Sequence, residues 1–342
     1  MYCCSKCFED RFLIPFVEQV SNLTDTCFFC ASTNVPVIEA DILSDRFQIL
    51  FDLYEISEDG LSMHDCLQND WQVFSSLLDS AKRDDLLTCI SGGNVGEKYK
   101  SKIQARETRI EQWNVFREEL KYNNRYFPDN VPDADALKNL FEMLVWPNED
   151  RINEIFRARI CKRGFAIPAA EMGKPPGEKA VNGRANPIGI PYLYTASDEK
   201  TAISEVRPYK GERVTVAKIR IDENLELADL RNPRHTISPF MLEENDLENL
   251  YSEMPFLVTL GEELSKPIIP REAALEYLPS QYLCELVKHI GFDGILYKSS
   301  LARGYNIALF HDTGFEIVDT KTFQIINNEI EYLEETKLGF AL

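Results

Sequence analysis

The stretch Y-L-Y-T-A-S-D-E-K-T-A-I-S-E-V-R-P, residues 192–208, predicts a short strand that is followed at once by a helix. Glu205 lies near the end of this helix among small and apolar residues. A helical glutamate is ordinarily a solvated surface residue. The alternative is a catalytic carboxylate that faces a nucleotide sugar, and the surrounding sequence has to decide between the two.

Strand and helix patterns continue through the second half of the chain, which begins near residue 150 after the turn sequence W-P-N-E-D. Short strands are predicted for V-T-V-A-K-I-R-I, N-I-A-L-F-H, F-E-I-V-D and F-Q-I-I-N, and a further helix for Q-Y-L-C-E-L-V-K-H-I. We therefore expect an α+β fold for this half.

Residues 40–150 instead show helical periodicity. The pattern covers A-D-I-L-S-D-R-F-Q-I-L-F-D-L-Y, D-W-Q-V-F-S-S-L-L-D-S-A, R-I-E-Q-W-N-V-F-R-E-E-L and D-A-L-K-N-L-F-E-M-L. Trp71, Phe74, Trp113 and Phe116 fall on its apolar positions, so we expect them to be core residues rather than a ligand site. This region is predicted to be an α-helical bundle.

The first residues carry two cysteine pairs, Cys4-x2-Cys7 and Cys27-x2-Cys30, with nineteen residues between them. Four thiolates at this spacing are typical of a closed tetrahedral zinc site, which stabilises a fold and does no chemistry. Cys3 is an alternative to Cys4 as a ligand, although its spacing to Cys7 is less usual. The alternative to zinc is a set of free buried thiols.

Composition limits the class of protein. The chain has 342 residues, enough for two or three units, and a formal net charge of -19. This charge repels phosphate backbones, so we expect no long nucleic acid as a partner. No window approaches the ~20 apolar residues of a membrane span. The N-terminal M-Y-C-C-S-K-C lacks the order of a signal peptide, and we expect a cytoplasmic protein.

One short segment has the opposite charge. Residues 157–184 contain seven lysines and arginines against two glutamates. The basic residues are Arg157, Arg159, Lys162, Arg163, Lys174, Lys179 and Arg184. A basic island in an acidic chain suits a small anionic ligand, and the planar guanidinium of arginine makes paired hydrogen bonds to a diphosphate. Solvated surface charges are the alternative.

Three further groups accompany this island. The loop G-R-A-N-P-I-G-I-P leads from Arg184 to Tyr194, whose ring could stack on a flat base. The sequence G-F-D-G-I-L-Y-K-S-S, residues 291–300, places Tyr297 and Ser299 on one face of a strand by its period of two. Together with Glu205 they form a set of arginine, aromatic, glutamate and serine side chains.

This ordered set resembles the RES domain family, which is named for its Arg, Glu and Ser. The matching phrases are F-R-A-R at 156–159, G-R-A-N-P-I-G-I-P-Y-L-Y at 183–194, T-A-I-S-E-V-R-P at 201–208 and G-F-D-G-I-L-Y-K-S at 291–299. The resemblance implies an ADP-ribosyltransferase-like split β-sheet over residues 149–342 that acts on NAD. One departure is Ala185, where many members have a tryptophan after the arginine.

The resemblance also implies roles for individual residues. It matches Arg157, Glu205 and Ser299 to the catalytic Arg, Glu and Ser. It further matches Arg159, Arg184, Tyr194 and Tyr297 to the NAD-binding pocket. Arg157, helped by Arg184, would hold the diphosphate, Tyr194 would stack with nicotinamide, and Ser299 would contact the nicotinamide-ribose end.

The front half is similar to N-terminal regions fused to RES domains, which pair cysteine knuckles with a HEPN-like helical domain. This implies a zinc-ribbon-like module over residues 1–36 and a HEPN-like domain over residues 37–148. None of the four histidines follows an arginine at the spacing that HEPN ribonucleases use, so we expect no ribonuclease activity.

The function implied by the resemblance is cleavage of the nicotinamide-ribose bond of NAD, as a glycohydrolase or a phosphorylase, by a bacterial toxin or defence effector. It implies an antitoxin or regulatory protein as partner and structural zinc as the metal, and it leaves a homo-oligomer open. One alternative is an ADP-ribosyltransferase that modifies a protein. Another is a non-enzymatic adapter with a degenerate nucleotide-binding module.

Overall fold

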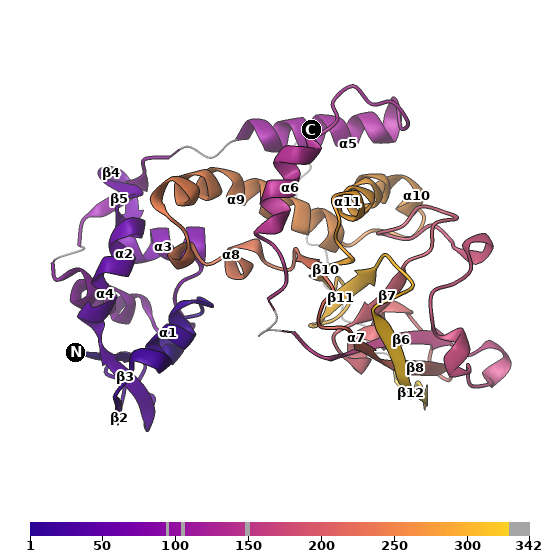
Figure 1. Cartoon of the computed structure of the whole chain (residues 1–342), viewed down its shortest axis with the longest axis horizontal. Coiled ribbons are helices and arrows are strands. Elements are labelled where there is room, and N and C mark those ends of the chain that lie inside the picture. The colour runs from indigo at the N-terminus through magenta and orange to yellow at the C-terminus, as the bar shows by residue number, and fades with distance from the viewer. Residues whose placement is uncertain (94–95, 104–106, 148–150, 328–342) are drawn as a thin grey trace, which may run out of the picture.

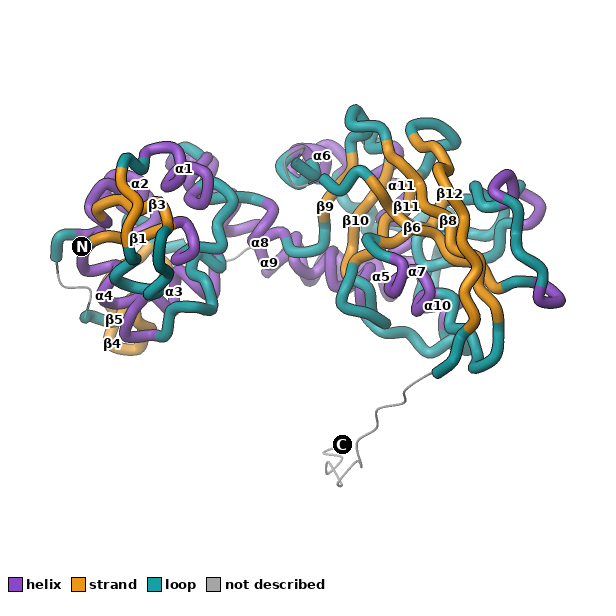
Figure 2. The backbone as a smooth tube through the Cα atoms, turned by 90° about the horizontal axis from the view of Figure 1, so that it is seen from below, coloured by secondary structure: helices purple, strands orange, loops and turns teal. Residues whose placement is uncertain are grey.

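The computed structural model describes residues 1–93, 96–103, 107–147 and 151–327. Figures 1 and 2 show two lobes. The N-terminal lobe contains small sheets and short helices, and the C-terminal lobe is built on a seven-stranded sheet. Helix α9 (Glu244–Ser265) extends from one lobe to the other (Figure 1). Among the described residues, no helix is long and apolar enough to cross a membrane.

The cysteine-bearing segment forms a three-stranded antiparallel sheet with the order β1-β3-β2. Its elements are β1 (Tyr2–Cys4), α1 (Leu13–Val20), β2 (Leu23–Asp25) and β3 (Val35–Glu39). Asp10 lies just before α1, and its Oδ1 accepts hydrogen bonds from the backbone N–H groups of Phe12 (2.8 Å) and Leu13 (2.9 Å). Burial raises the pKa of this carboxyl.

Most of the predicted helices of the next region are present. They are α2 (Ser44–Phe51), α3 (Met63–Trp71), α4 (Ser80–Ser91), α5 (Glu107–Tyr122) and α6 (Ala134–Glu142). The four aromatic residues predicted to be core are buried, which confirms that prediction. The continuous helix predicted over residues 70–81 is wrong, because Gln72 adopts a left-handed conformation (φ 54°) that ends α3 and Asp79 caps a new helix, α4.

Two features of this region were not predicted. Strands β4 (Tyr54–Ser62) and β5 (Lys98–Ser101) form an antiparallel pair between the helices. Helix α5 packs on α9 and on α11 (Leu278–His289) of the second half. Ion pairs join Arg109 to Glu253 (3.0 Å) and Arg117 to Glu263 (2.9 Å) across this contact. The helical region therefore packs directly against the C-terminal half through α5.

Helix α9 was also missed, because Pro255 lies in its middle. Proline has no N–H to donate and normally ends a helix, so the sequence M-P-F favours a break. The carbonyl that loses its donor is that of Tyr251, four residues before Pro255, and the hydroxyl of Thr259 donates to the carbonyl of Pro255 in the next turn (2.9 Å). Leu250, Leu257 and other apolar side chains along the helix are buried, and this packing outweighs the missing hydrogen bond.

The chain between β9 (Leu227–Asp229) and α9 binds the N-terminal lobe. It contains α8 (Pro233–Thr236). Asn232 donates to Gln72 (2.7 Å), and the hydroxyl of Ser238 donates to Asp10 (3.0 Å). The rings of Phe47 and Phe240 lie 5.0 Å apart. One continuous core of buried residues therefore runs from the cysteine segment to one face of the large sheet.

The large sheet has the order β12-β8-β6-β7-β11-β10-β9. Its remaining strands are β6 (Glu154–Ile160), β7 (Leu193–Ala196), β8 (Arg213–Ile221), β10 (Gly294–Lys298), β11 (Tyr305–Leu309) and β12 (Phe315–Gln324). Helix α7 (Glu199–Glu205) follows β7, and α10 (Ala273–Glu276) precedes α11. The predicted α+β organisation of this half is confirmed, although β12 contains F-E-I-V-D together with the first two residues of F-Q-I-I-N, so the second predicted strand is not separate.

The sheet is nearly divided between β6 and β7. These strands share one residue pair, Phe156 with Ala196, whereas β6 pairs with β8 over seven residues. Beyond that pair the two strands diverge, and their side chains and backbone edges face a common space. The divergence creates the cavity described below.

Candidate functional site

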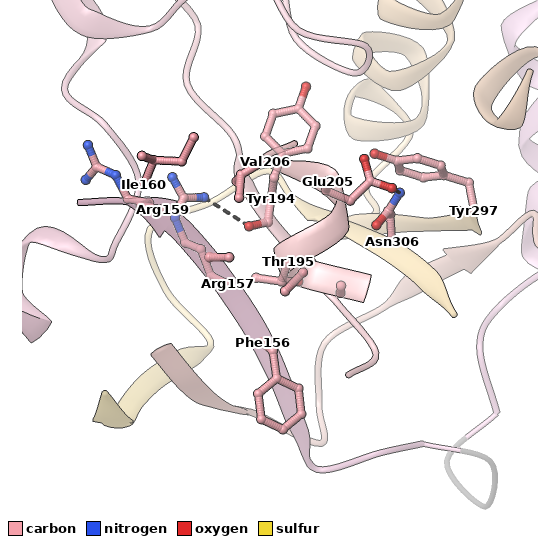
Figure 3. Close-up of a pocket in the computed structure, with 13 residues that line it drawn as sticks. Phe156, Arg157, Arg159, Ile160, Tyr194, Thr195, Glu205, Val206, Tyr297 and Asn306 are labelled. Carbon is pink, nitrogen blue, oxygen red and sulfur yellow. Dashed lines mark hydrogen bonds between the residues drawn. The ribbon is translucent and has the colours of Figure 1, made fainter. Parts of the chain in front are cut away.

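A cavity of about 420 Å³ lies where β6 and β7 separate (Figure 3). Strand β6, strand β7, the last turn of α7 and the pair β10 and β11 supply its walls. The lining residues are Phe156, Arg157, Ala158, Arg159, Ile160, Tyr194, Thr195, Ala196, Ala202, Glu205, Val206, Tyr297 and Asn306. Its size is within the range of small-molecule sites. Five of the seven residues predicted for the catalytic and NAD-binding site line it.

Arg157 provides the positive charge of one wall. Its Nη1 donates to the carbonyl of Tyr194 across the divergence of the strands (3.0 Å; Figure 3). Within the described residues, no carboxylate lies within ion-pairing distance of this guanidinium, and its buried Nε has no hydrogen-bond partner. Burial, with the neighbouring charge of Arg159, lowers the pKa of Arg157 to about 10. A half-buried guanidinium with no carboxylate beside it is typical of an anion site.

The other residues of the basic island have different surroundings. Arg159 lines the cavity and donates to the carbonyl of Glu171. Arg184 does not line it; its guanidinium lies over the ring of Tyr277 at 5.4 Å. Lys174 is held by the carbonyl of Phe310 and is a structural residue. The side chain of Arg163 lies outside the described part of the chain. Two arginines of the island therefore reach the cavity.

Tyr194 forms part of the wall between Arg157 and Glu205 in Figure 3. Its hydroxyl donates to Asn186 Oδ1 (2.7 Å) and accepts from the backbone N–H of Ala185 (2.9 Å). A Cβ at Gly183 would lie 2.5 Å from this hydroxyl, so only glycine fits there. The loop that was predicted to flank the site is thus fastened to the ring of Tyr194, and Ala185 in this loop is buried.

Glu205 is the last residue of α7, which begins at the side-chain cap of Asp198. Its Oε1 accepts two hydrogen bonds, one from the hydroxyl of Ser299 (2.6 Å) and one from the amide of Asn306 (2.8 Å). No partner of Oε2 is present among the described residues. The carboxylate is therefore fixed through one oxygen, and the other is open to a ligand.

Ser299 follows strand β10 and contacts Glu205 directly. Its Oγ accepts hydrogen bonds from the backbone N–H groups of Leu301 and Ala302, both at 3.1 Å. Because both lone pairs are engaged in this way, its single proton is directed to Glu205. The structure thus brings together the glutamate and the serine that the sequence placed 94 residues apart.

Asn306 was not predicted, although it completes this cluster. It lies on β11 directly opposite Tyr297 of β10, so both side chains are on one face of the sheet. Asn306 is buried, and its Oδ1 has no hydrogen-bond partner among the described residues. A signal was present in N-I-A-L-F-H, where period-two alternation places the polar Asn306 on the same face as the apolar Ala308.

The four cysteines predicted as metal ligands also come together. The sulfur atoms of Cys4, Cys7, Cys27 and Cys30 all lie within 4.8 Å of one another. Cys4 Sγ lies 3.4 Å from Cys30 Sγ, and Cys7 Sγ lies 3.4 Å from Cys27 Sγ. Tetrahedral zinc with Zn–S bonds of about 2.3 Å would separate sulfurs by roughly 3.8 Å, so the set fits a zinc ion. Cys3 is outside this set, because alternation along β1 turns it to the opposite face.

One wall of the cavity therefore carries an arginine with no carboxylate beside it among the described residues, and the other carries a glutamate fixed by two hydrogen bonds. The family model described as the RES domain matches residues 154–327, and the chain belongs to this family. The resemblance noted from the sequence is confirmed.

No curated protein is significantly similar to this chain. Among solved structures, a chain of the M. tuberculosis MbcT-MbcA toxin-antitoxin complex is similar, with 13% sequence identity and a TM-score of 0.35. The match covers 56% of this chain and 93% of that chain.

Proposed function

We propose that this protein consumes NAD by cleaving the bond between nicotinamide and ribose. Membership of the RES domain family supports this proposal. The observation that carries it is the cavity itself, in which Glu205, fixed through Oε1, and the unpaired Arg157 line opposite walls. A dinucleotide offers a diphosphate to the arginine and a sugar to the carboxylate.

The chemistry follows from charge. The bond between the ribose carbon and the nicotinamide nitrogen breaks, and its electron pair leaves with neutral nicotinamide. Positive charge develops on the sugar, and the Glu205 carboxylate stabilises it. An oxygen of the acceptor then bonds to the sugar carbon and loses its proton to solvent. Arg157, with Arg159, holds the diphosphate, and the ring of Tyr194 stacks on nicotinamide.

Ser299 has a positioning role in this proposal. Its proton is directed to Glu205 Oε1 in the free protein, so contact with the nicotinamide-ribose end would require that bond to break. With Asn306 it aims the open oxygen of Glu205 into the cavity. The predicted role of Arg184 in holding the diphosphate is assigned to Arg159 instead, because Arg159 lines the cavity.

The identity of the acceptor distinguishes three enzymes. Purified protein is incubated with NAD, with and without phosphate, and with cell extract. Nicotinamide with free ADP-ribose indicates a glycohydrolase, and nicotinamide with phosphorylated ADP-ribose indicates a phosphorylase. Labelled protein indicates an ADP-ribosyltransferase. Unchanged NAD in every mixture would contradict the proposal and favour a non-enzymatic adapter.

The remaining parts of the proposal concern the front half. We place a zinc-ribbon-like module at residues 1–36, a HEPN-like helical domain at residues 37–148 and the RES domain at residues 149–342. NAD loss is toxic to a cell, so the protein acts as a cytoplasmic toxin or defence effector that an antitoxin or regulatory protein restrains. The front half provides the surface for that partner, or for a second copy of the chain.

Zinc has a structural role in this proposal, and its removal gives a direct test. Cys4→Ser is expected to lose bound zinc and to unfold at a lower temperature, because the ion holds β1 to the second knuckle. Cys3→Ser, in the same strand, is the matched control and should retain one zinc per chain. Zinc content is measured on purified protein by mass spectrometry. Full zinc content in Cys4→Ser together with loss of zinc in Cys3→Ser would show that Cys3, and not Cys4, is the zinc ligand.

A further inference from the structure

Helix α11 carries two buried polar residues, Ser280 and Gln281, beside the apolar side chains with which it packs into the core. Ser280 is fully buried, and Gln281 is 5% exposed. Buried polar groups are costly unless they are hydrogen-bonded, so their partners show what they stabilise. Both side chains bond the loop of residues 182–186, which precedes β7.

Gln281 makes most of the contacts between α11 and this loop. Its amide Nε2 donates to three oxygens of the loop, which are Asn182 Oδ1 (2.8 Å) and the carbonyls of Gly183 (2.7 Å) and Asn186 (3.1 Å). An amide NH2 group has two protons, so two of these oxygens share one proton. The hydroxyl of Ser280 donates to the carbonyl of Arg184 (2.7 Å). Side chains of the helix therefore hold the loop against α11.

Asn186 gives the loop its internal shape. Its Nδ2 donates to three carbonyls, which are those of Val181 (3.1 Å), Pro187 (3.0 Å) and Ile190 (2.8 Å). Its own carbonyl accepts from the backbone N–H of Gly183 (3.0 Å). All of these bonds stay within residues 181–190. The bonds from α11 have a different effect, because they join the loop to another element and so fix where it lies.

The loop is also fastened to the wall of the cavity. The hydroxyl of Tyr194 donates to Asn186 Oδ1 and accepts from the backbone N–H of Ala185. The carbonyl of Tyr194 in turn accepts from Arg157 (3.0 Å). Tyr194 and Arg157 line the cavity, whereas Gln281 does not. A continuous series of hydrogen bonds therefore runs from α11 through the loop to two residues of the site.

Glu205 does not depend on this series. It belongs to α7, and its carboxylate is fixed by Ser299 and Asn306. A shift of the loop would therefore move the wall to which we assign substrate binding and leave the Glu205 carboxylate in place. Binding and chemistry should thus respond differently when the bonds from α11 are removed.

We propose that Gln281 is a positioning residue of the site, which holds residues 182–186 against α11 so that Tyr194 and Arg157 are in place before NAD binds. The inference rests on the proposed function for the identity of the ligand. Gln281 acts through Tyr194 and does not contact the substrate. Without Gln281, the loop occupies its binding-competent position for only a fraction of the time, and the apparent affinity falls by that fraction.

The test uses the full-length protein and a carbocyclic NAD analogue that cannot be cleaved. Gln281→Met keeps the length of the side chain and removes its hydrogen-bond donors. We expect the dissociation constant of the analogue and KM for NAD to rise about tenfold, with kcat within about twofold of the wild type. Ser280→Ala removes the separate bond to the carbonyl of Arg184 and should produce a smaller change in the same direction.

A double-mutant cycle distinguishes positioning from a general loss of stability. Tyr194→Phe removes the hydroxyl through which the loop is fastened to the cavity wall. In that background, Gln281→Met should weaken binding of the analogue by less than about twofold, because the connection is already broken. A purely structural effect would be additive and would give the same change in both backgrounds.

Leu283→Ala is the matched control on the same helix. Leu283 is fully buried, so its truncation should lower the melting temperature. The variant retains the hydrogen-bonding groups of Ser280 and Gln281, and it should bind the analogue as the wild type does. Binding is measured at a temperature at which circular dichroism shows every variant to be folded.

The outcomes are separate from those of the proposed function. Binding of the analogue without cleavage of NAD would contradict the proposed reaction, and the effect of Gln281→Met on binding would still be measured. Unchanged binding in Gln281→Met would overturn the inference, and so would a tenfold loss that persists in the Tyr194→Phe background. An equal loss in Leu283→Ala, or a wild type that does not bind the analogue, would also overturn it. If Gln281→Met does not fold, unchanged binding in Ser280→Ala has the same consequence.

Discussion

Glu205→Gln is expected to fold normally and to cleave NAD at least about 10²-fold more slowly than the wild type. The change keeps the volume of the side chain and removes its negative charge. The oxygen of glutamine can still accept from Ser299 and Asn306, so the local structure is retained. What is lost is the stabilisation of positive charge on the sugar, which is worth roughly 3 kcal/mol for a key electrostatic group. The substitution should therefore lower kcat.

The measurement is the rate of nicotinamide release at saturating NAD, with circular dichroism to establish folding. Glu199→Gln is the matched control, because Glu199 begins the same helix and does not line the cavity. It should retain activity within about twofold. An unchanged rate in Glu205→Gln would return Glu205 to the role of a solvated helix residue.

Part of the site could be predicted from the sequence, because short-range patterns specify it. The strand and helix of residues 192–208 are specified by short-range patterns, and Asp198 caps the helix that ends with Glu205. Alternation along a strand likewise places Tyr297 and Ser299 together. The family's order of motifs implies that these residues form one pocket with Arg157. The structure brings the set together.

The remaining features depend on contacts between distant segments. The divergence of β6 and β7 is a matter of register, which the sequence of either strand leaves undetermined. From the sequence alone, Asn306 is recognised only as a strand residue. Its position beside Glu205 depends on the pairing of β11 with both β7 and β10. Helix α9 contradicts the local signal of Pro255, because burial of its apolar side chains provides more free energy than one backbone hydrogen bond. Among the described residues no carboxylate lies beside Arg157, and this depends on which elements pack around the cavity.

Arg157→Met should separate binding from stability. The guanidinium is half-buried, has no carboxylate within ion-pairing distance among the described residues, and has a pKa lowered to about 10 by burial. A cation whose pKa is lower in the folded state than in the unfolded state destabilises the fold fully at pH values below both, including neutral pH. Methionine removes that penalty and gives up one hydrogen bond to Tyr194, worth about 1 kcal/mol. We expect a melting temperature that is unchanged or higher.

Binding should change in the opposite direction. Loss of a charge-assisted contact with the diphosphate is expected to weaken binding of a carbocyclic NAD analogue that cannot be cleaved, and to raise KM for NAD, by about 10²-fold. Because the diphosphate is remote from the bond that breaks, kcat should change much less than in Glu205→Gln.

Arg220→Met, which removes an exposed arginine of β8 paired with Glu316, is the control and should leave KM unchanged. A variant with normal KM and a reduced kcat would place Arg157 at the reacting sugar, and one with a lower melting temperature would make it a structural residue. Together the two substitutions assign binding to one wall of the cavity and catalysis to the other.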